Sequence, residues 1–164
     1  MLKIARNMRE LSFGCLMEVY REGNRENAAQ QWPEIPLEQG ILLAEQDFYQ
    51  YLREVLFTVP GAVCAIWEVD GGYKSALRLE PYRDGLLLAA LETAPQHRRH
   101  GFAESLIREV QAVYQGTRIY SHVGKGNGTS LRLHEKCSFR RILEYAIYLD
   151  GSVNQKCCTL VYGP

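Results

Sequence analysis

Three apolar segments separated by two short turn sequences lie between Ala62 and Thr93, and they constrain the fold most. The segments read AVCAIWEV, YKSALRLE and LLLAALET, and the connections between them are DGG and PYRDG. Short runs rich in apolar and β-branched residues, bounded by Gly, Pro and Asp, are typical of strands joined by tight turns. We therefore predict a three-stranded antiparallel meander.

Further elements are predicted on the N-terminal side of the meander. MLKIA can form a short first strand, and Met8, Leu11, Cys15 and Val19 recur at helical spacing. Residues 21–40 contain two glycines and two prolines, and we interpret them as a helix end followed by a loop. Apolar residues then return with a period of 3.6 from Ile41 to Val55, which predicts a second helix.

On the C-terminal side, strands and helices alternate. We expect a helix over 102–115, a strand at RIYSHV, a short helix over 129–137, and a final hairpin of FRRILEYAIYL and KCCTLVY. The hairpin would turn near Asp150 and Gly151. No repeat or long linker divides the chain, so residues 1–164 are expected to form one domain of the mixed α/β (α+β) class, with a mostly antiparallel central sheet flanked by helices.

Composition excludes several function classes. The formal net charge is +0, so nucleic-acid binding through the overall charge of the protein is not expected. No apolar run reaches the roughly 18 residues of a membrane span. The five cysteines are odd in number and show no CxxC or Cys/His spacing, which argues against a disulfide framework or a metal site. We predict a cytoplasmic protein without metal, a monomer or homodimer.

The segment QHRRHGFAESLI joins the last strand of the meander to the following helix. The free backbone N–H groups of a helix N-terminus attract anions. Gly101 has no Cβ to block their approach, Ala103 keeps the next turn open, and Arg98 and Arg99 can neutralise phosphate from the side. The segment therefore predicts a phosphate site, whereas a solvated basic helix start is the alternative for these residues alone.

Two segments resemble the GNAT family of acetyl-CoA-dependent N-acetyltransferases. Arg98, Gly101 and Ala103 fit the family signature R/Q-x-x-G-x-G/A. NGTSLRLHEKCSF, from Asn127 to Phe139, resembles N-x-x-A-x-x-L-Y-E-K-L-G-F, with four differences: Ser130 for alanine, His134 for tyrosine, Cys137 for leucine and Ser138 for glycine. The resemblance is specific over residues 86–139 and weak in the first sixty residues. It implies the GNAT fold, with an acetyl-CoA-binding core over 86–139 and acceptor-side elements over 1–60.

The resemblance also implies how the donor substrate, acetyl-CoA, is bound. The pyrophosphate would lie on the segment from Arg98 to Ala103, and the pantetheine arm between two separated strands, near Leu91–Thr93 and RIYSHV. Asn127 occupies the position that commonly hydrogen-bonds this arm. The cofactor-binding residues predicted are Leu91, Thr93, Arg98, Arg99, His100, Gly101, Phe102, Ala103 and Asn127.

Two residues are predicted to be catalytic. An ammonium group must lose a proton before it attacks a thioester, and Glu92, at the end of the strand beside the expected reaction centre, is the candidate base. Glu68 and Glu80 on neighbouring strands are alternatives. His134 stands where the family often has a tyrosine that protonates the leaving thiolate, and a histidine without a catalytic task is equally compatible with the sequence. A backbone N–H near Leu91–Thr93 would stabilise the oxyanion.

The predicted function is N-acetyl transfer to a primary amine by direct attack in a ternary complex. The acceptor could be a small molecule or a protein amine, and acidic residues in the first third of the chain make a cationic amine a reasonable hypothesis. One alternative is a non-catalytic coenzyme A-binding sensor or scaffold. A nucleic-acid module built on QHRRH is disfavoured because interleaved aromatic residues are absent.

Overall fold

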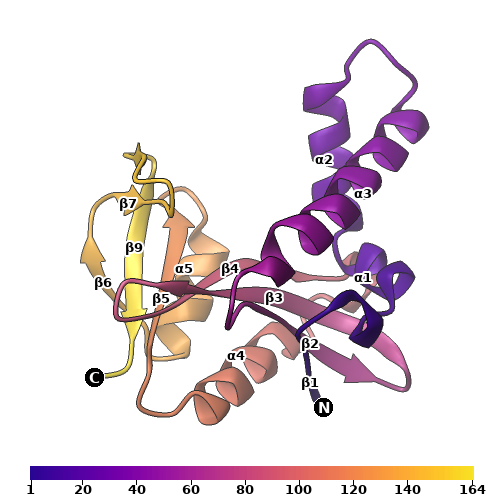
Figure 1. The fold of residues 1–164 in the computed structure, drawn as a ribbon. Helices are drawn as coiled ribbons and strands as arrows, with labels where there is room; N and C mark the ends of the chain where they lie inside the picture. The colour runs from indigo at the N-terminus through magenta and orange to yellow at the C-terminus, as the bar shows by residue number, and fades with distance from the viewer.

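A seven-stranded mixed sheet forms the centre of the computed structural model, which describes residues 1–164 (Figure 1). Its strand order is β1-β2-β3-β4-β5-β9-β6, and β4 and β5 are the one parallel pair. A separate two-stranded sheet pairs β7 with β8. The strands are β1 (Leu2–Ala5), β2 (Val63–Val69), β3 (Gly72–Tyr82), β4 (Gly85–Thr93), β5 (Arg118–Gly124), β6 (Arg140–Leu143), β7 (Ala146–Ile147), β8 (Val153–Asn154) and β9 (Cys157–Tyr162).

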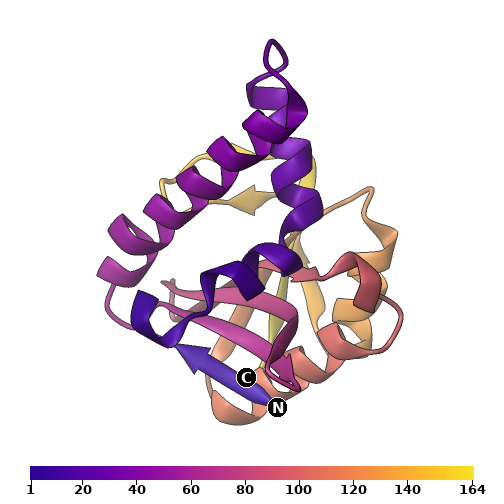
Figure 2. The same cartoon turned by 90° about the vertical axis from the view of Figure 1, so that its right-hand side faces the viewer.

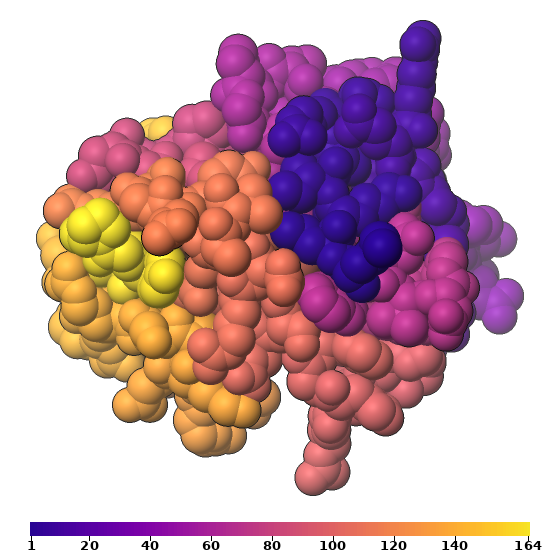
Figure 3. Space-filling view, turned by 90° about the horizontal axis from the view of Figure 1, so that it is seen from below, coloured from indigo at the N-terminus to yellow at the C-terminus, as the bar shows by residue number.

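Five α-helices and three short 3₁₀ helices accompany the sheet. Helices α2 and α3 form a pair that extends away from the sheet, while α4 covers the opposite face (Figures 1 and 2). The helices are α1 (Phe13–Val19), α2 (Arg21–Gln31), α3 (Leu37–Glu54), α4 (Phe102–Val113) and α5 (Gly128–Lys136), with 3₁₀ helices η1 (Met8–Glu10), η2 (Leu56–Thr58) and η3 (Pro95–His97). In the view from below, both chain ends reach one face, separated by the surface of α4 and β5 (Figure 3).

Side-chain alternation along β2 explains why the sheet is covered on both faces. Val63 and Ala65 belong to the core packed against α4, whereas Cys64 and Ile66 belong to the core beneath α1 and α3. A strand buried on both faces has apolar residues at successive positions. The run AVCAIWEV therefore requires helices on both sides.

The predicted meander, the strand at RIYSHV and the helices near 41–55, 102–115 and 129–137 are present, which confirms the mixed α/β fold class. The prediction for residues 21–40 was wrong in part, because Arg21–Gln31 is helix α2 and only 32–36 is loop. This helix has just two buried residues, Asn24 and Ala28, so no apolar stripe marks it. It packs closely on α3, because a Cβ at Gly40 would lie 3.1 Å from the Cβ of Ala28.

Two further segments differ from their predictions in detail. The single helix expected from Met8 to Val19 is divided, because Leu11 is extended between η1 and α1. The final hairpin pairs β6 with β9 and turns near Gly151 as predicted, but the small β7–β8 sheet interrupts it. None of the helices combines the length and the apolar character that a membrane crossing requires.

Candidate functional site

Strands β4 and β5 pair at one end and separate at the other. Gly85–Leu88 pairs with Arg118–Ser121, and the ladder ends there. The close approach needs Gly85, since a Cβ at this position would lie 2.1 Å from the carbonyl oxygen of Arg118. Further along β4, Ala90 has a φ of 50° and the register with β3 shifts, which is the geometry of a β-bulge. A cavity of about 200 Å³ opens between the separated ends.

The turn after β4 presents the N-terminus of α4. Arg99 and Gly101 have φ values of 66° and 78°, and Gly101 is the N-cap of α4, with no side-chain hydrogen bond to the first turn. The first N–H groups of the helix are therefore left without a side-chain partner, so they can bind an anion. A Cβ at Gly101 would meet nothing within 4 Å, so the space beside this turn is open.

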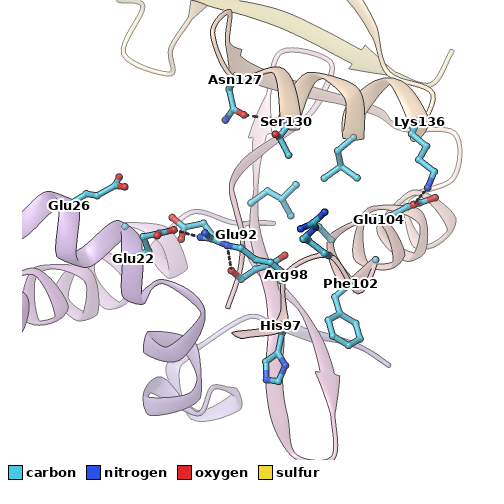
Figure 4. A pocket seen from close by; sticks show the side chains of 18 residues that line it. Glu22, Glu26, Glu92, His97, Arg98, Phe102, Glu104, Asn127, Ser130 and Lys136 are labelled. Atoms are coloured by element: carbon cyan, nitrogen blue, oxygen red, sulfur yellow. Dashed lines mark hydrogen bonds and ion pairs between the residues drawn. The ribbon is translucent and has the colours of Figure 1, made fainter. Parts of the chain in front are cut away.

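A cleft of about 590 Å³ joins this turn to α2, β4 and α5 (Figure 4). It brings together eight predicted cofactor-binding residues and the predicted base. These residues are Leu91, Thr93, Arg98, Arg99, Gly101, Phe102, Ala103, Asn127 and Glu92. His100 does not line the cleft: its Nδ1 lies 2.8 Å from the carbonyl oxygen of Arg98, and its ring stacks on Phe102 at 5.8 Å.

The cleft also contains residues that were not predicted. Thr129, Ser130, Leu133 and Lys136 come from α5, inside the segment that carried the second resemblance, so helical spacing from Asn127 could have identified them. Three others, Glu22, Gly23 and Glu26, come from α2. Glu22 and Glu26 belong to the acidic first third that suggested a cationic acceptor, but because α2 was interpreted as a helix end and loop, their place in this cleft was not predicted.

Arg98 bridges the cleft to α2. Its guanidinium makes an ion pair with Glu22, and its Nε donates a hydrogen bond to the carbonyl oxygen of Thr93 at 3.4 Å (Figure 4). Both side chains of the ion pair are nearly half exposed. Exposed ion pairs contribute at most about 1 kcal/mol, so a bound phosphate can draw Arg98 away from Glu22 at little cost.

A carboxylate in the first turn of α4 is neutralised by two cations. Glu104 accepts hydrogen bonds from Lys136 at 2.5 Å and from Arg108 at 3.0 Å. These bonds, Lys136 first, hold the pKa of Glu104 below its usual range. The negative charge beside the candidate anion site is thus compensated, and Lys136 of α5 is brought to the cleft wall.

Glu92 lies where the cleft meets a second cavity. That second cavity, called the side cavity below, has a volume of about 270 Å³ and lies between the sheet, α2 and α3. Burial raises the pKa of Glu92 to about 7, and Glu26 and Glu22 act in the same direction while Arg98 opposes them. At neutral pH the carboxyl group is therefore close to half ionised, which suits a group that takes up a proton.

The two alternative carboxylates do not line the cleft. Glu68 faces Lys3, with 3.5 Å between its Oε2 and the lysine Nζ. Glu80 is buried and accepts a hydrogen bond from the Tyr51 hydroxyl at 2.9 Å. Of the three carboxylates considered, Glu92 alone is placed beside both the cleft and the side cavity.

His134 is buried in the gap between β4 and β5, at 2% exposure. Its Nδ1 lies 2.8 Å from the carbonyl oxygen of Ser130. A carbonyl oxygen only accepts, so Nδ1 carries the proton, and in the neutral ring Nε2 carries the lone pair. Nε2 is buried without a hydrogen-bond partner, and burial lowers the pKa of the ring.

Asn127 connects the cleft to the same gap. It is exposed and caps α5, where its Oδ1 accepts a hydrogen bond from the Ser130 N–H at 3.0 Å. Its side chain lines both cavities, and the amide nitrogen makes no hydrogen bond within the protein. No group of three or more His, Cys, Asp and Glu side chains is placed to hold a metal ion.

Comparison with known proteins identifies the fold class as that of the N-acetyltransferases. The chain aligns with PaiA N-acetyltransferase from Thermoplasma acidophilum in complex with coenzyme A, at 14% identity and a TM-score of 0.61, covering 100% of this chain and 99% of that one. It aligns with ribosomal-protein-S18-alanine N-acetyltransferase from Escherichia coli at 14% identity and a TM-score of 0.60, covering 98% and 92%. It aligns with an acetyltransferase from Thermus thermophilus at 14% identity and a TM-score of 0.61, covering 99% of this chain and 96% of that one.

A match to a family model agrees with this fold. Residues 74–148 match the family model described as "FR47-like protein", which is related to GNAT. No curated protein matches this chain by sequence. The GNAT resemblance predicted from the sequence is therefore confirmed, and the chain has the GNAT fold.

Proposed function

We propose that the protein transfers an acetyl group from acetyl-CoA to a primary amine, by direct attack in a ternary complex. The observation that carries the proposal is the position of Glu92, a carboxyl group with its pKa raised to about 7, between a phosphate-compatible cleft and the side cavity. A transferase of this kind needs two binding spaces that meet at one proton acceptor.

The cleft and the gap between β4 and β5 fit acetyl-CoA as the donor. The uncapped first turn of α4 would bind the pyrophosphate, with Arg98 and Arg99 supplying positive charge. The pantetheine arm would extend into the gap beside Asn127, whose free amide nitrogen can donate to a pantetheine carbonyl. The fold shared with the coenzyme A complex of the PaiA enzyme supports this placement.

Glu92 would take the proton from the acceptor ammonium, directly or through a water molecule. The neutral amine then attacks the thioester carbon, forming the new C–N bond. A backbone N–H near Leu91–Thr93 would stabilise the oxyanion until the C–S bond breaks and the thiolate leaves. The nitrogen then loses its second proton to water, which leaves the neutral amide, and the thiolate takes a proton from water to give the free thiol. Glu92 lines both the cleft and the side cavity. It could therefore accept a proton from an amine bound in the side cavity while staying outside the part of the cleft proposed for the pyrophosphate.

The general-acid role of His134 stays a prediction, and the hydrogen bond of Nδ1 determines which protonation state this role requires. In the neutral ring Nε2 has no proton to give, since the proton is on Nδ1. Donation to the thiolate would require the doubly protonated ring, which burial opposes. As a hydrogen-bond acceptor, by contrast, the neutral ring can contact an N–H group in the gap between β4 and β5.

An acetyl-transfer screen tests the proposed function. Purified protein is incubated with acetyl-CoA and a panel of amino acids, amino sugars, polyamines and peptides, and release of free thiol is measured. We expect amine-dependent thiol release that follows saturation kinetics. Tight acetyl-CoA binding in calorimetry without transfer to any amine would instead support the non-catalytic sensor.

Gly23→Ala is expected to lower kcat about 10- to 100-fold without changing acetyl-CoA affinity, because small displacements of a catalytic group have effects of this size. A Cβ at Gly23 would lie 2.7 Å from Oε1 of Glu92, so the carboxylate has to move. The measurement is kcat beside the calorimetric Kd for acetyl-CoA.

Gly14→Ala is the matched control, since Gly14 is also helical and a Cβ there meets nothing within 4 Å. Both changes should raise the free energy of unfolding by up to about 1 kcal/mol through helix propensity. Equal kcat values for the two variants would show that the position of Glu92 does not matter.

A further inference from the structure

Arg78 carries an unpaired positive charge into the side cavity. This residue lies on β3, and the side cavity is lined by Tyr20, Asn24, Phe48, Tyr51, Arg78 and Glu92, among others. The guanidinium carbon lies 4.7 Å from the centre of the Tyr51 ring, and Nε is buried without a hydrogen-bond partner. No carboxylate lies within 4 Å of it, in contrast to Arg98, Arg108 and Arg118, each of which makes an ion pair.

The carboxylate on the same strand is already engaged. Glu80 lies two residues from Arg78, so both side chains are on one face of β3. Its Oε1 accepts the hydrogen bond from the Tyr51 hydroxyl, and no ion pair joins it to Arg78. A half-buried guanidinium without an anion is unfavourable unless a ligand supplies one. Arg78 is therefore ready to bind an anionic group inside the side cavity.

The opposite charge lies on the neighbouring strand. Glu92 pairs with Ala76 across β3 and β4, and Ala76 and Arg78 are on the same face of β3. Arg78 and Glu92 thus line one cavity from adjacent strands, one as a fixed cation and the other as a proton acceptor. Tyr20, Phe48 and Tyr51 line the same cavity and form an aromatic wall. The ring centres of Tyr20 and Phe48 are 5.0 Å apart, and those of Phe48 and Tyr51 are 6.5 Å apart.

We propose that the acceptor is an amino acid, whose carboxylate is bound by Arg78 and whose amine is presented to Glu92. This inference rests on the proposed function, and it names the substrate class of the same site. The aromatic wall would contact the amino-acid side chain, and about 270 Å³ accommodates a single small molecule. A polyamine or another purely cationic acceptor would be repelled by the charge of Arg78, so this proposal favours a different acceptor from the cationic amine that the acidic N-terminal third suggested.

The test compares each acceptor with an analogue that lacks the carboxylate. Leucine is paired with isoamylamine and leucinamide, and phenylalanine with phenethylamine and phenylalaninamide. An acidic dipeptide amide, Asp-Ala-NH₂, represents a peptide that offers a side-chain carboxylate instead. We expect kcat/KM for the better free amino acid to exceed that of its amine and amide about 100-fold, and to exceed that of the dipeptide, because an unmatched buried charge is costly.

Arg78→Met should remove this preference, chiefly by raising KM for the amino acid, while the calorimetric Kd for acetyl-CoA stays within about threefold. The ratio of amino acid to amine is measured within one variant, so it does not depend on the folded fraction. Arg53→Met is the matched control, because Arg53 lies 5.8 Å from the Tyr49 ring outside the side cavity. Arg78→Lys keeps the charge and should retain part of the preference.

Calorimetry with leucine and phenylalanine on the coenzyme A-loaded protein separates this inference from the proposed function. Binding that Arg78→Met abolishes, without acetyl transfer, would support the amino-acid site and overturn the transferase. Transfer to isoamylamine or to the dipeptide amide as efficient as transfer to the free amino acids would leave the transferase in place and overturn the amino-acid site. If neither leucine nor phenylalanine binds in calorimetry, the amino-acid site is also overturned.

Discussion

Glu92→Gln is expected to lower kcat for acetyl transfer about 100- to 1000-fold while leaving the Kd for acetyl-CoA unchanged, since removing a general base typically has an effect of this size. The glutamine keeps the volume and the polarity of the side chain but cannot take a proton from the ammonium. Steady-state thiol release gives kcat, and calorimetry gives the Kd.

The pH dependence of the wild-type reaction should report the same carboxyl group. Its pKa is raised to about 7, and only the ionised form is a base, so kcat/KM should rise with pH through about 7 and then level off. Glu92→Gln should remove this ascending limb. A profile that is unchanged in the variant would assign the limb to another group.

Stability should change in the opposite direction from activity. Because the pKa of Glu92 is higher in the folded than in the unfolded chain, folding is not penalised by this group below about pH 4.5. The penalty grows as pH rises from about 4.5 to 7, and it persists at higher pH. Glu92→Gln should therefore be more stable than the wild type at pH 8, by roughly 1–3 kcal/mol, and equally stable near pH 4.

Glu68→Gln is the control for these measurements. Glu68 is the alternative carboxylate that pairs with Lys3 outside the cleft, and we expect its loss to change kcat less than about twofold. A large loss of kcat in this variant, or a loss below threefold in Glu92→Gln, would refute the assignment of the base.

The second large effect is expected from Gly101→Glu, which should weaken acetyl-CoA binding at least about 100-fold, because like charges would be placed together at the anion site. Gly101 lines the cleft at the start of α4, and the space beside it is open. The new side chain thus has room in the free protein but would occupy the position proposed for the pyrophosphate. Calorimetry with acetyl-CoA measures the change.

Gly116→Glu provides the control for backbone strain and charge. Gly116 has a φ of 82°, near the 78° of Gly101, and a Cβ there also meets nothing within 4 Å. Gly116 follows the other end of α4, outside the cleft. Both variants should lose about 1–2 kcal/mol of stability from the left-handed conformation, and only Gly101→Glu should lose affinity. Equal affinities would mean that the pyrophosphate binds elsewhere.

Much of the candidate donor cleft was predictable because its sequence signals are local. The turn from Arg98 to Gly101 and helices α4 and α5 are contiguous in the chain, and each depends on helical periodicity, on glycine conformation or on a capping asparagine. Helix α2 was missed for a related reason. It buries only Asn24 and Ala28 of its eleven residues, so its position depends on packing against α3, which no local pattern encodes.

The sequence by itself determined the meander, the glycine turn before α4, and helices α4 and α5, because periodicity and turn chemistry act between residues close in the chain. The tertiary structure decided the rest of the site, since it depends on contacts between distant residues, such as the ion pair of Glu22 with Arg98, which are 76 residues apart. Folding brings Glu22 and Gly23 against Arg98 and Glu92, and burial then raises the pKa of Glu92. The absence of a carboxylate partner for Arg78 likewise depends on which side chains the fold places around it.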